Sequence, residues 1–250
     1  MTPAIALAAV TKEFELSRDR HGSLKATVLS LRRPRPRRLK ALDGIDLRIE
    51  RGESVAVIGR NGSGKSTLLR IIGRVYLPTS GTVEVDGRMS TMLDLGAGFH
   101  PELTGRENIF FNGAIMGLSV RQIREKMDSI IDFAELGEFI DSPVRTYSAG
   151  MQMRLGFAVA TETDPDIVLI DEVLAVGDAE FQQKCYGRID EFKRTGKTLV
   201  FVTHDLAAAR LVASRTVWMH GGTVRLDGDT EHAVSAYVAS LPHEHESRGE

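Results

Sequence analysis

The chain has 250 residues, a formal net charge of −2, 42% hydrophobic residues and 26% charged residues, which is the balance of a globular protein. No apolar run approaches the ~20 residues that a membrane-spanning helix needs, and the N-terminus lacks the basic start of a secretory signal. A single cysteine, Cys185, excludes a disulfide framework and is typical of a reducing compartment.

The charge is unevenly spread. Residues 18–40 contain nine Lys or Arg and one acid, whereas the remainder carries ten more acidic than basic residues. Inside this basic insertion, taken as about 15–40, Leu24, Val28 and Leu31 have helical spacing. A basic amphipathic helix would suit an anionic membrane surface or a membrane partner, and a solvated insertion is the alternative. Arg-rich runs also suit nucleic acid, but the acidic remainder argues against that partner.

Short apolar runs alternate with helical patterns along the chain. Strands are expected where apolar residues alternate or cluster, and helices where they recur every three or four positions. In chain order the predicted elements are a strand at 45–49, a buried strand at 55–58, a helix from Ser66, a hairpin over 81–93 turning at Asp86-Gly87, a helix at 121–136, buried strands at 167–170 and 198–203, a hairpin over 216–228 turning at Gly221-Gly222, and a helix at 231–241.

This alternation predicts an α/β fold with a parallel sheet core flanked by antiparallel pieces. The stretch at about 100–163 lacks strand patterns and is expected to form an inserted helical subdomain. One domain is therefore expected over 1–241. The polar residues 242–250 are expected to form a loose tail.

The strongest motif is GRNGSGKST, which fits the phosphate-binding pattern G-x-x-x-x-G-K-[ST] and follows a buried strand. Its glycines let backbone N–H groups close around phosphate oxygens, and the helix N-terminus adds free donors. Lys65 is expected to reach the β- and γ-phosphates of ATP, and the Ser66 hydroxyl to bind Mg²⁺. The predicted ATP-binding residues here are Gly59, Asn61, Gly62, Ser63, Gly64, Lys65, Ser66 and Thr67.

Two further strand ends carry titratable residues. Asp171 and Glu172 end the run IVLIDE, and His204 follows TLVFVT. Because parallel strands end at one crevice of an open sheet, these residues are expected near the phosphate-binding loop. Asp171 is predicted to hold Mg²⁺, directly or through water, and Glu172 to act as the general base on the attacking water. His204 is predicted to contact the γ-phosphate, with a structural histidine as the alternative.

In this order and spacing, GRNGSGKST, YSAGMQMRL, VLIDE and VTHD resemble the ATP-binding subunit of ABC transporters. The resemblance covers most of the chain and implies a P-loop NTPase (RecA-like) core. It implies that Phe14 stacks on adenine, with a core phenylalanine as the alternative. It also implies a homodimer enclosing two ATP molecules, with Ser148, Ala149 and Gly150 at the partner's ATP and Asp178 crossing the interface.

The helix start YSAGMQMRL departs from the Leu-Ser-Gly-Gly-Gln usual in these ATPases. Tyr147, Ala149 and Met151 replace three of the five residues. Ser148 remains a favourable N-cap, and Gly150 lets the backbone approach an anion. The substitutions therefore keep the part of the motif that binds an anion.

A second departure concerns a glutamine that these ATPases usually place near Mg²⁺. No glutamine occurs between Lys65 and Arg121. In the corresponding loop, 93–108, Asp94 and His100 are the candidates to replace it, and an ordinary glycine-containing loop is the alternative.

Together, LGAGFHPELTGREN and YSAGMQMRL resemble one subgroup, the ATPases that export O-antigen, teichoic acid and capsular polysaccharides. The resemblance implies an ATP-hydrolysing motor at the cytoplasmic face of the membrane. It would act on a permease dimer that carries the polysaccharide or lipid-linked glycan. The alternatives are another transport substrate, a soluble ABC-type ATPase not coupled to transport, and a nucleotide sensor without turnover. The polymer, its lipid carrier and the permease cannot be named from the sequence.

Overall fold

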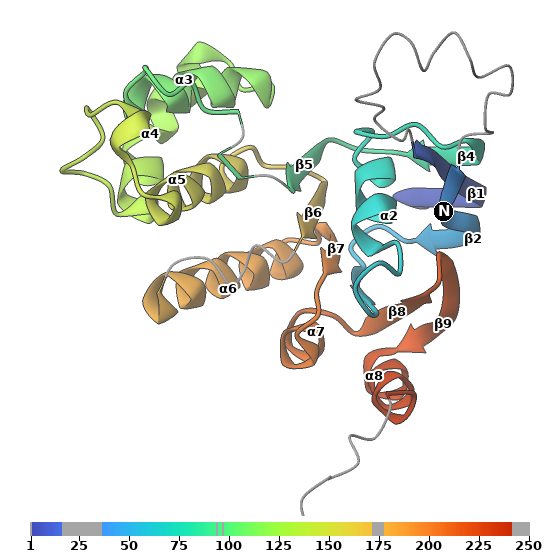
Figure 1. Ribbon diagram of the computed structural model, residues 1–250. Helices are drawn as coiled ribbons and strands as arrows, with labels where there is room; N and C mark the ends of the chain where they lie inside the picture. Colours follow the sequence, from blue (N-terminus) through green and yellow to red (C-terminus); the bar gives the residue numbers. More distant parts are fainter. Residues whose placement is uncertain (1, 17–36, 94, 97, 172–177, 242–250) are drawn as a thin grey trace, which may run out of the picture.

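The computed structural model describes residues 2–16, 37–93, 95–96, 98–171 and 178–241. Figure 1 shows the helices α3, α4 and α5 gathered on one side of the molecule and the strands β1, β2 and β4 on the other, with α2 and a larger sheet between them. The strands are β1 Ile5–Leu16, β2 Arg37–Ile49, β3 Ser54–Ile58, β4 Ser80–Val85, β5 Met89–Met92, β6 Ile167–Asp171, β7 Thr198–Val202, β8 Arg215–His220 and β9 Thr223–Asp229. The helices are α2 Lys65–Ile72, α3 Gly105–Ile115, α4 Val120–Ala134, α5 Ala149–Thr161, α6 Ala179–Arg194, α7 Leu206–Val212 and α8 Thr230–Ala239, with a 3₁₀ turn at Val144–Thr146.

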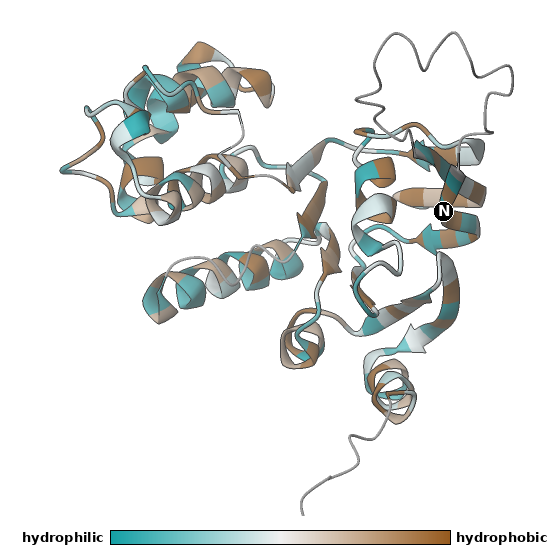
Figure 2. Ribbon diagram, viewed as in Figure 1, coloured by the Kyte–Doolittle hydropathy of each residue, from teal (hydrophilic) through white to brown (hydrophobic). Residues whose placement is uncertain are grey.

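The larger sheet has the strand order β5-β6-β7-β3-β8-β9 and is parallel except at the β8–β9 edge. Its side chains alternate between two cores, so both faces are covered. Leu169 and Val200 pack into the core formed with α2, while Val168 and Phe201 pack into the core formed with α6 and α7. Figure 2 shows β6 and β7 as hydrophobic along their length, as expected for strands buried on both faces. The predicted α/β fold with a parallel core is confirmed.

The smaller sheet is antiparallel, with the order β2-β1-β4. The sequence pattern did not reveal β1, because its alternation is interrupted. Ile5 and Leu7 are buried on one face, but Ala9 takes a φ of +49° and the next buried residue is Val10. The register with β2 shifts at this point, which is the geometry of a β-bulge. Leu16 pairs with Arg37, so the ends of the insertion predicted at about 15–40 are parts of β1 and β2, and its middle, 17–36, lies outside the described residues.

The hairpin predicted over 81–93 is wrong. β4 pairs with β1 in the smaller sheet, whereas β5 pairs in parallel with β6 in the larger sheet. Gly87 turns the chain from one sheet to the other with a φ of +138°, and the Arg88 N–H then donates to the Asp166 carboxylate at 2.8 Å. A turn dipeptide between two strand-like runs does not distinguish a hairpin from a sheet-to-sheet crossing. The hairpin predicted over 216–228 is confirmed by the antiparallel β8–β9 pair.

The helices α3, α4 and α5 form the helical insertion that the sequence predicted. α3 and α4 each begin with a capping box, Thr104 with Glu107 and Ser119 with Gln122, which satisfies donors at both helix starts. The helix predicted at 121–136 is confirmed as α4, and its buried residues recur at the helical spacing from which it was predicted: Ile123, Met127, Ile130, Ile131 and Ala134. Among the residues described, no helix combines the length and the apolar composition needed to cross a bilayer.

Candidate nucleotide site

The phosphate-binding loop connects β3 to α2 at the centre of the larger sheet. Gly62 and Gly64 have φ angles of +78° and +104°, a region that favours glycine. A Cβ at Gly64 would lie 2.6 Å from the Ala41 carbonyl oxygen, so this position also requires glycine for space. At Gly62 no atom lies within 4 Å of the ideal Cβ position. The loop is therefore closed toward β2 and open on its other side.

The interior of the loop has the chemistry of an anion site. Lys65 is 6% exposed, and its ammonium donates to the carbonyl oxygens of Gly59 at 2.8 Å and Arg60 at 3.2 Å. Ser63 is 4% exposed, and its hydroxyl is the one buried side-chain polar atom of the described residues without a hydrogen-bond partner. α2 has no acidic residue in its first turn and no side-chain cap. The backbone N–H groups of a helix start, a buried cation and a buried hydroxyl without a hydrogen-bond partner together favour a phosphate group.

A turn from another part of the chain supports this loop. Gly222, in the β8–β9 turn, donates its N–H to the Ser63 carbonyl at 3.0 Å and accepts from the Asp43 N–H at 2.8 Å. The turn therefore joins the loop to β2. Sequence reasoning identified the turn at Gly221-Gly222 but not this contact, because no local pattern links positions so far apart.

Sheet register brings the predicted strand ends to the loop. Asp171 of β6 and Val57 of β3 both pair with Val202 of β7, on its two sides. With strands about 4.8 Å apart, the backbones of Asp171 and Val57 lie on the order of 10 Å apart. The Thr203 N–H donates to the Val57 carbonyl at 3.2 Å, so His204 follows at the same edge of the sheet.

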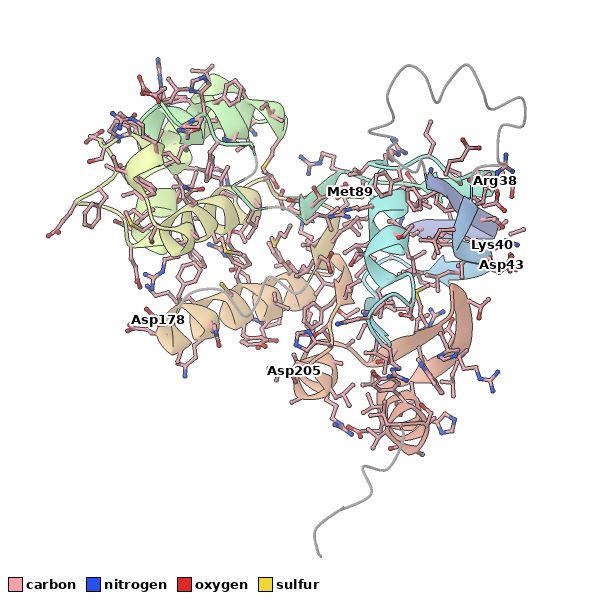
Figure 3. The ribbon with its side chains drawn as sticks, viewed as in Figure 1. Arg38, Lys40, Asp43, Met89, Asp178 and Asp205 are labelled. Atoms are coloured by element: carbon pink, nitrogen blue, oxygen red, sulfur yellow. The ribbon has the colours of Figure 1, made fainter. Side chains whose placement is uncertain are left out.

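The side chains at this edge differ in burial. Asp171 is half-buried and His204 is exposed. Asp205, next to His204, caps α7 by accepting from the Ala207 and Ala208 N–H groups at 2.8 and 3.2 Å, and Figure 3 shows it at the start of that helix. The cap fixes the turn that carries His204. Glu172 lies outside the described residues.

The donors available at this edge fit Mg²⁺. Ser66 follows Lys65 in the first turn of α2, and Asp171 ends the strand beside β7. Hydroxyl and carboxylate oxygens are hard donors, and Mg²⁺ is usually held by few protein groups together with substrate phosphates. Within the described ranges no three His, Cys, Asp or Glu side chains gather as a metal cluster.

Phe14 belongs to a cluster of aromatic and basic side chains. Its half-buried ring meets the Tyr76 ring edge-on, with centroids 5.5 Å apart. The Lys12 ammonium lies 5.1 Å from the Phe14 centroid and 5.7 Å from that of Tyr76, and Arg70 lies 5.9 Å from Tyr76. Phe14 is thus neither fully buried nor isolated. Stacking on adenine remains a prediction, and Tyr76 and Lys12 are neighbours that the sequence did not indicate.

The start of α5, which the sequence predicts to bind an anion, has exposed residues that follow a buried tyrosine. Ser148 caps α5 by accepting from the Met151 N–H at 3.2 Å, and Ser148 and Ala149 are exposed, whereas Gly150 is half-buried. Tyr147 is buried, and its hydroxyl donates to the Phe139 carbonyl at 2.7 Å. Burial raises the pKa of this phenol above its usual value. The residue that replaces the usual leucine therefore fixes the position of the cap.

The Tyr147 side chain also explains why residue 105 is a glycine. A Cβ at Gly105 would lie 2.3 Å from the Tyr147 hydroxyl oxygen. The first residue of α3 therefore has to be small where the phenol packs. Tyr147 and Gly105 therefore belong to one packing arrangement.

The loop before α3 is held by a buried amide. Asn108 is fully buried; its Oδ1 accepts from the His100 N–H at 2.7 Å, and its Nδ2 donates to the carbonyls of His100, Leu103 and Thr104 at 2.9–3.1 Å. The His100 Nδ1 accepts from the Glu102 N–H at 3.3 Å. His100 is therefore part of the helix-start loop, and its replacement of the usual glutamine remains a prediction. The other candidate, Asp94, lies outside the described residues.

Asp178 caps α6 by accepting from the Phe181 N–H at 2.9 Å. This bond, followed by the charge of Arg154, holds the pKa of the Asp178 carboxyl below its usual value. The carboxylate also accepts from the Arg154 guanidinium at 2.5 Å. Its reach toward a second copy of the chain remains a prediction. The amphipathic helix predicted between Leu24 and Leu31 and the tail 242–250 lie outside the described residues.

A P-loop at the end of a central strand, carboxylate and histidine at neighbouring strand ends, and an inserted helical layer define an ATP-binding cassette. The family model for ABC transporters matches residues 42–175. The chain belongs to the ABC transporter family and is an ABC-type ATPase, as the sequence predicted.

Similar proteins carry related names. The chain is 50% identical over 245 residues to the O-antigen export system ATP-binding protein RfbB of Myxococcus xanthus, covering 95% of this chain and 56% of that protein. It is 44% identical to the protein of the same name from Klebsiella pneumoniae, covering 96% of this chain and 100% of that protein. The teichoic acids export ATP-binding protein TagH of Lactiplantibacillus plantarum is 44% identical, with 91% of this chain and 62% of that protein covered.

A solved structure shares the fold. The dimeric ATP-binding cassette MJ0796, in a post-hydrolysis state bound to ADP and Pi, aligns with a TM-score of 0.74 and 25% identity, covering 90% of this chain and 98% of that chain.

Proposed function

We propose that the chain is the ATP-hydrolysing subunit of an ABC exporter that moves a polysaccharide or lipid-linked glycan across the cytoplasmic membrane. The observation that carries this proposal is the loop at 59–67 with its buried Lys65, combined with export-system relatives of matching length. The O-antigen and teichoic acid names of several relatives favour a glycan of one of these types. Peripheral attachment at the cytoplasmic face follows from a role as a motor subunit.

In this proposal the chain's own groups bind and orient ATP. Lys65 would exchange its bonds to the loop carbonyls for the β- and γ-phosphates, and the Ser63 hydroxyl and the α2 N–H groups would donate to the same oxygens. Mg²⁺, held by Ser66 and Asp171, would neutralise charge on the phosphates. Glu172 would accept a proton from the attacking water, and His204 would donate to the γ-phosphate. Phe14 would stack on the adenine ring.

Two copies of the chain would form the working unit. Ser148, Ala149 and Gly150 lie at an exposed helix start, where the N–H groups and the helix dipole favour an anion. Such a site is incomplete alone and is suited to the γ-phosphate bound by the partner. The solved relative is a dimer bound to ADP and Pi, which supports a homodimer here.

A membrane permease would dock on an apolar surface beside α3. Phe111 and Ile115 are 48% and 66% exposed, and Val75, on the loop after α2, is 57% exposed. Val75 and Met116 also line a cavity of about 210 Å³ between the helical layer and the larger sheet. Exposed apolar residues next to a cavity suit insertion of an apolar partner segment. Leu93, Phe99 and other described residues of the loop 93–108 line the same cavity. A movement at the nucleotide site would therefore be passed to the permease through this loop.

The test is affinity purification of the chain from detergent-solubilised membranes, followed by mass spectrometry. We expect a multi-spanning permease in equal amount and loss of a surface glycan when the gene is deleted. Recovery of the chain in the soluble fraction without a membrane partner would overturn the exporter and favour a soluble ABC-type ATPase. Recovery with a permease but without loss of glycan would assign a different transport substrate.

A further inference from the structure

One arginine of α5 contacts both neighbouring helix ends. The Arg154 guanidinium donates to the Glu135 carboxylate at 2.7 Å and to the Asp178 carboxylate at 2.5 Å. Glu135 is the C-cap of α4, and Asp178 is the N-cap of α6. Three helices that are separate in sequence are therefore joined through one side chain.

The surroundings of Arg154 restrict its conformation. Its side chain is 17% exposed, and the guanidinium lies 4.9 Å from the Phe181 ring centroid in α6. Lys184 of α6 also pairs with Glu135. A planar guanidinium that stacks on a ring and binds two carboxylates loses most of its freedom, so it can fix the groups that it contacts.

The contact joins two groups that the proposed function assigns to the dimer interface. Ser148 caps the helix that carries Arg154, six positions earlier, which is about 9 Å along a helix that rises ~1.5 Å per residue. Asp178 is 62% exposed although it binds Arg154. Figure 3 shows it at the start of α6, on the side where α3, α4 and α5 gather. Both groups thus face solvent while their helices are held together.

A second arginine provides a structural comparison. Arg188 of α6 donates to Glu162 at 3.1 Å and to Glu191 at 3.1 Å, and it lies 5.4 Å from the Phe133 ring centroid. Glu162 follows α5 and also accepts from Lys126 of α4 at 2.9 Å. Arg188 therefore joins the same three helices with the same kinds of contact. It touches neither Asp178 nor the start of α5 in these interactions.

We propose that Arg154 is a positioning residue that holds Asp178 and the Ser148 helix start in a fixed relation, so that both reach the partner subunit's nucleotide together. This inference rests on the proposed function. If Arg154 only held the three helices together, loss of Arg154 and loss of Arg188 would have the same effect on ATP hydrolysis. If it positions Asp178, loss of Arg154 alone would impair the step that needs the closed dimer.

The experiment compares full-length Arg154→Met with the matched control Arg188→Met. We measure kcat, KM and Hill coefficient for ATP hydrolysis, the Kd of a fluorescent ATP analogue, and the midpoint of urea unfolding. We expect Arg154→Met to lower kcat about tenfold to a hundredfold, the cost of a misplaced group, and to reduce the Hill coefficient. The nucleotide Kd should change less than about twofold, since the loop at 59–67 is untouched. Arg188→Met should shift the unfolding midpoint similarly but keep its kcat.

Two further variants separate positioning from stability. Asp178→Asn keeps an N-cap acceptor but removes the ion pair, so it should reproduce the kcat loss. Because the two residues act as a unit, Arg154→Met combined with Asp178→Asn should be no slower than the slower single variant. Arg154→Lys keeps the positive charge but lacks the planar guanidinium that binds two carboxylates at once. Its kcat should therefore lie between those of Arg154→Met and the wild type.

Equal kcat for Arg154→Met and Arg188→Met, or additive losses in the double variant, would overturn the proposal. A wild-type chain that binds the analogue without hydrolysing ATP would instead overturn the proposed function. The two failures are therefore distinguishable in the same set of measurements.

Discussion

The turn that supports the phosphate-binding loop contains two glycines that can be substituted separately. An alanine at either position must take a positive φ, +55° at Gly221 and +80° at Gly222, which costs about 1–2 kcal/mol. The two positions differ in their surroundings. A Cβ at Gly222 would lie 2.9 Å from the Ala41 carbonyl oxygen and 3.2 Å from its carbon, whereas nothing lies within 4 Å at Gly221.

The expected effects follow from this difference. Gly221→Ala should lower the free energy of unfolding by about 1–2 kcal/mol. Gly222→Ala adds an overpacking cost of about 1–3 kcal/mol, for a total of about 2–5 kcal/mol. Relief of the clash also moves the Gly222 N–H away from the Ser63 carbonyl. Loss of one such bond, worth about 1 kcal/mol, should weaken ATP binding about fivefold in Gly222→Ala only.

The assay is urea unfolding of each variant together with titration of a fluorescent ATP analogue. Gly221→Ala is the control, because it carries the same conformational cost in the same turn. Equal unfolding free energies for the two variants, or unchanged ATP affinity in Gly222→Ala, would refute the role of the turn as a support for the loop.

Four further outcomes are expected. Lys65→Ala should weaken ATP binding about tenfold to a hundredfold, since a charge-assisted bond contributes about 1.5–3 kcal/mol, and unchanged affinity in a titration would count against the loop. Glu172→Gln should lower kcat about 10²–10⁴-fold, the range for a lost general base; full turnover in a clean preparation would refute that role. Tyr147→Phe should lower the free energy of unfolding by about 1 kcal/mol, because the Phe139 carbonyl loses a donor, with urea unfolding as the measurement. Burial raises the pKa of the Cys185 thiol from its usual 9.0 to about 12. The folded chain then keeps a proton that the unfolded chain loses, so this contribution to stability is present below pH 9 and is lost as the pH rises toward 12. The fall in unfolding midpoint between pH 7 and pH 10 should be smaller in Cys185→Ala, and an equal fall would contradict it.

Local patterns predicted the parts of the fold that are built locally. The helix α4 shows this most clearly, since each residue expected on its apolar face is buried. The loop at 59–67 was predictable because spacing, preceding strand and following helix agree in one short stretch. Its position beside Asp171 and His204 followed from a general rule for parallel strands, and the register of β6, β7 and β3 agrees with it.

Contacts between distant segments were not predictable in the same way. The bulge at Ala9 displaced the apolar alternation and hid β1. The dipeptide Asp86-Gly87 indicated a turn but not the sheet that the chain enters next. Arg154 and Asp178 are 24 positions apart, and no periodicity connects them. A single sequence carries no signal for such pairs.

The buried Asn108 amide has a mechanical consequence. Its bonds to His100, Leu103 and Thr104 stiffen the segment before α3, so that loop and helix have little compliance relative to each other. Ile115, at the far end of the same helix, is exposed. A force on the Ile115 end of α3 would therefore move the helix and the segment from His100 to Thr104 together, as one rigid unit, and would bend the loop little.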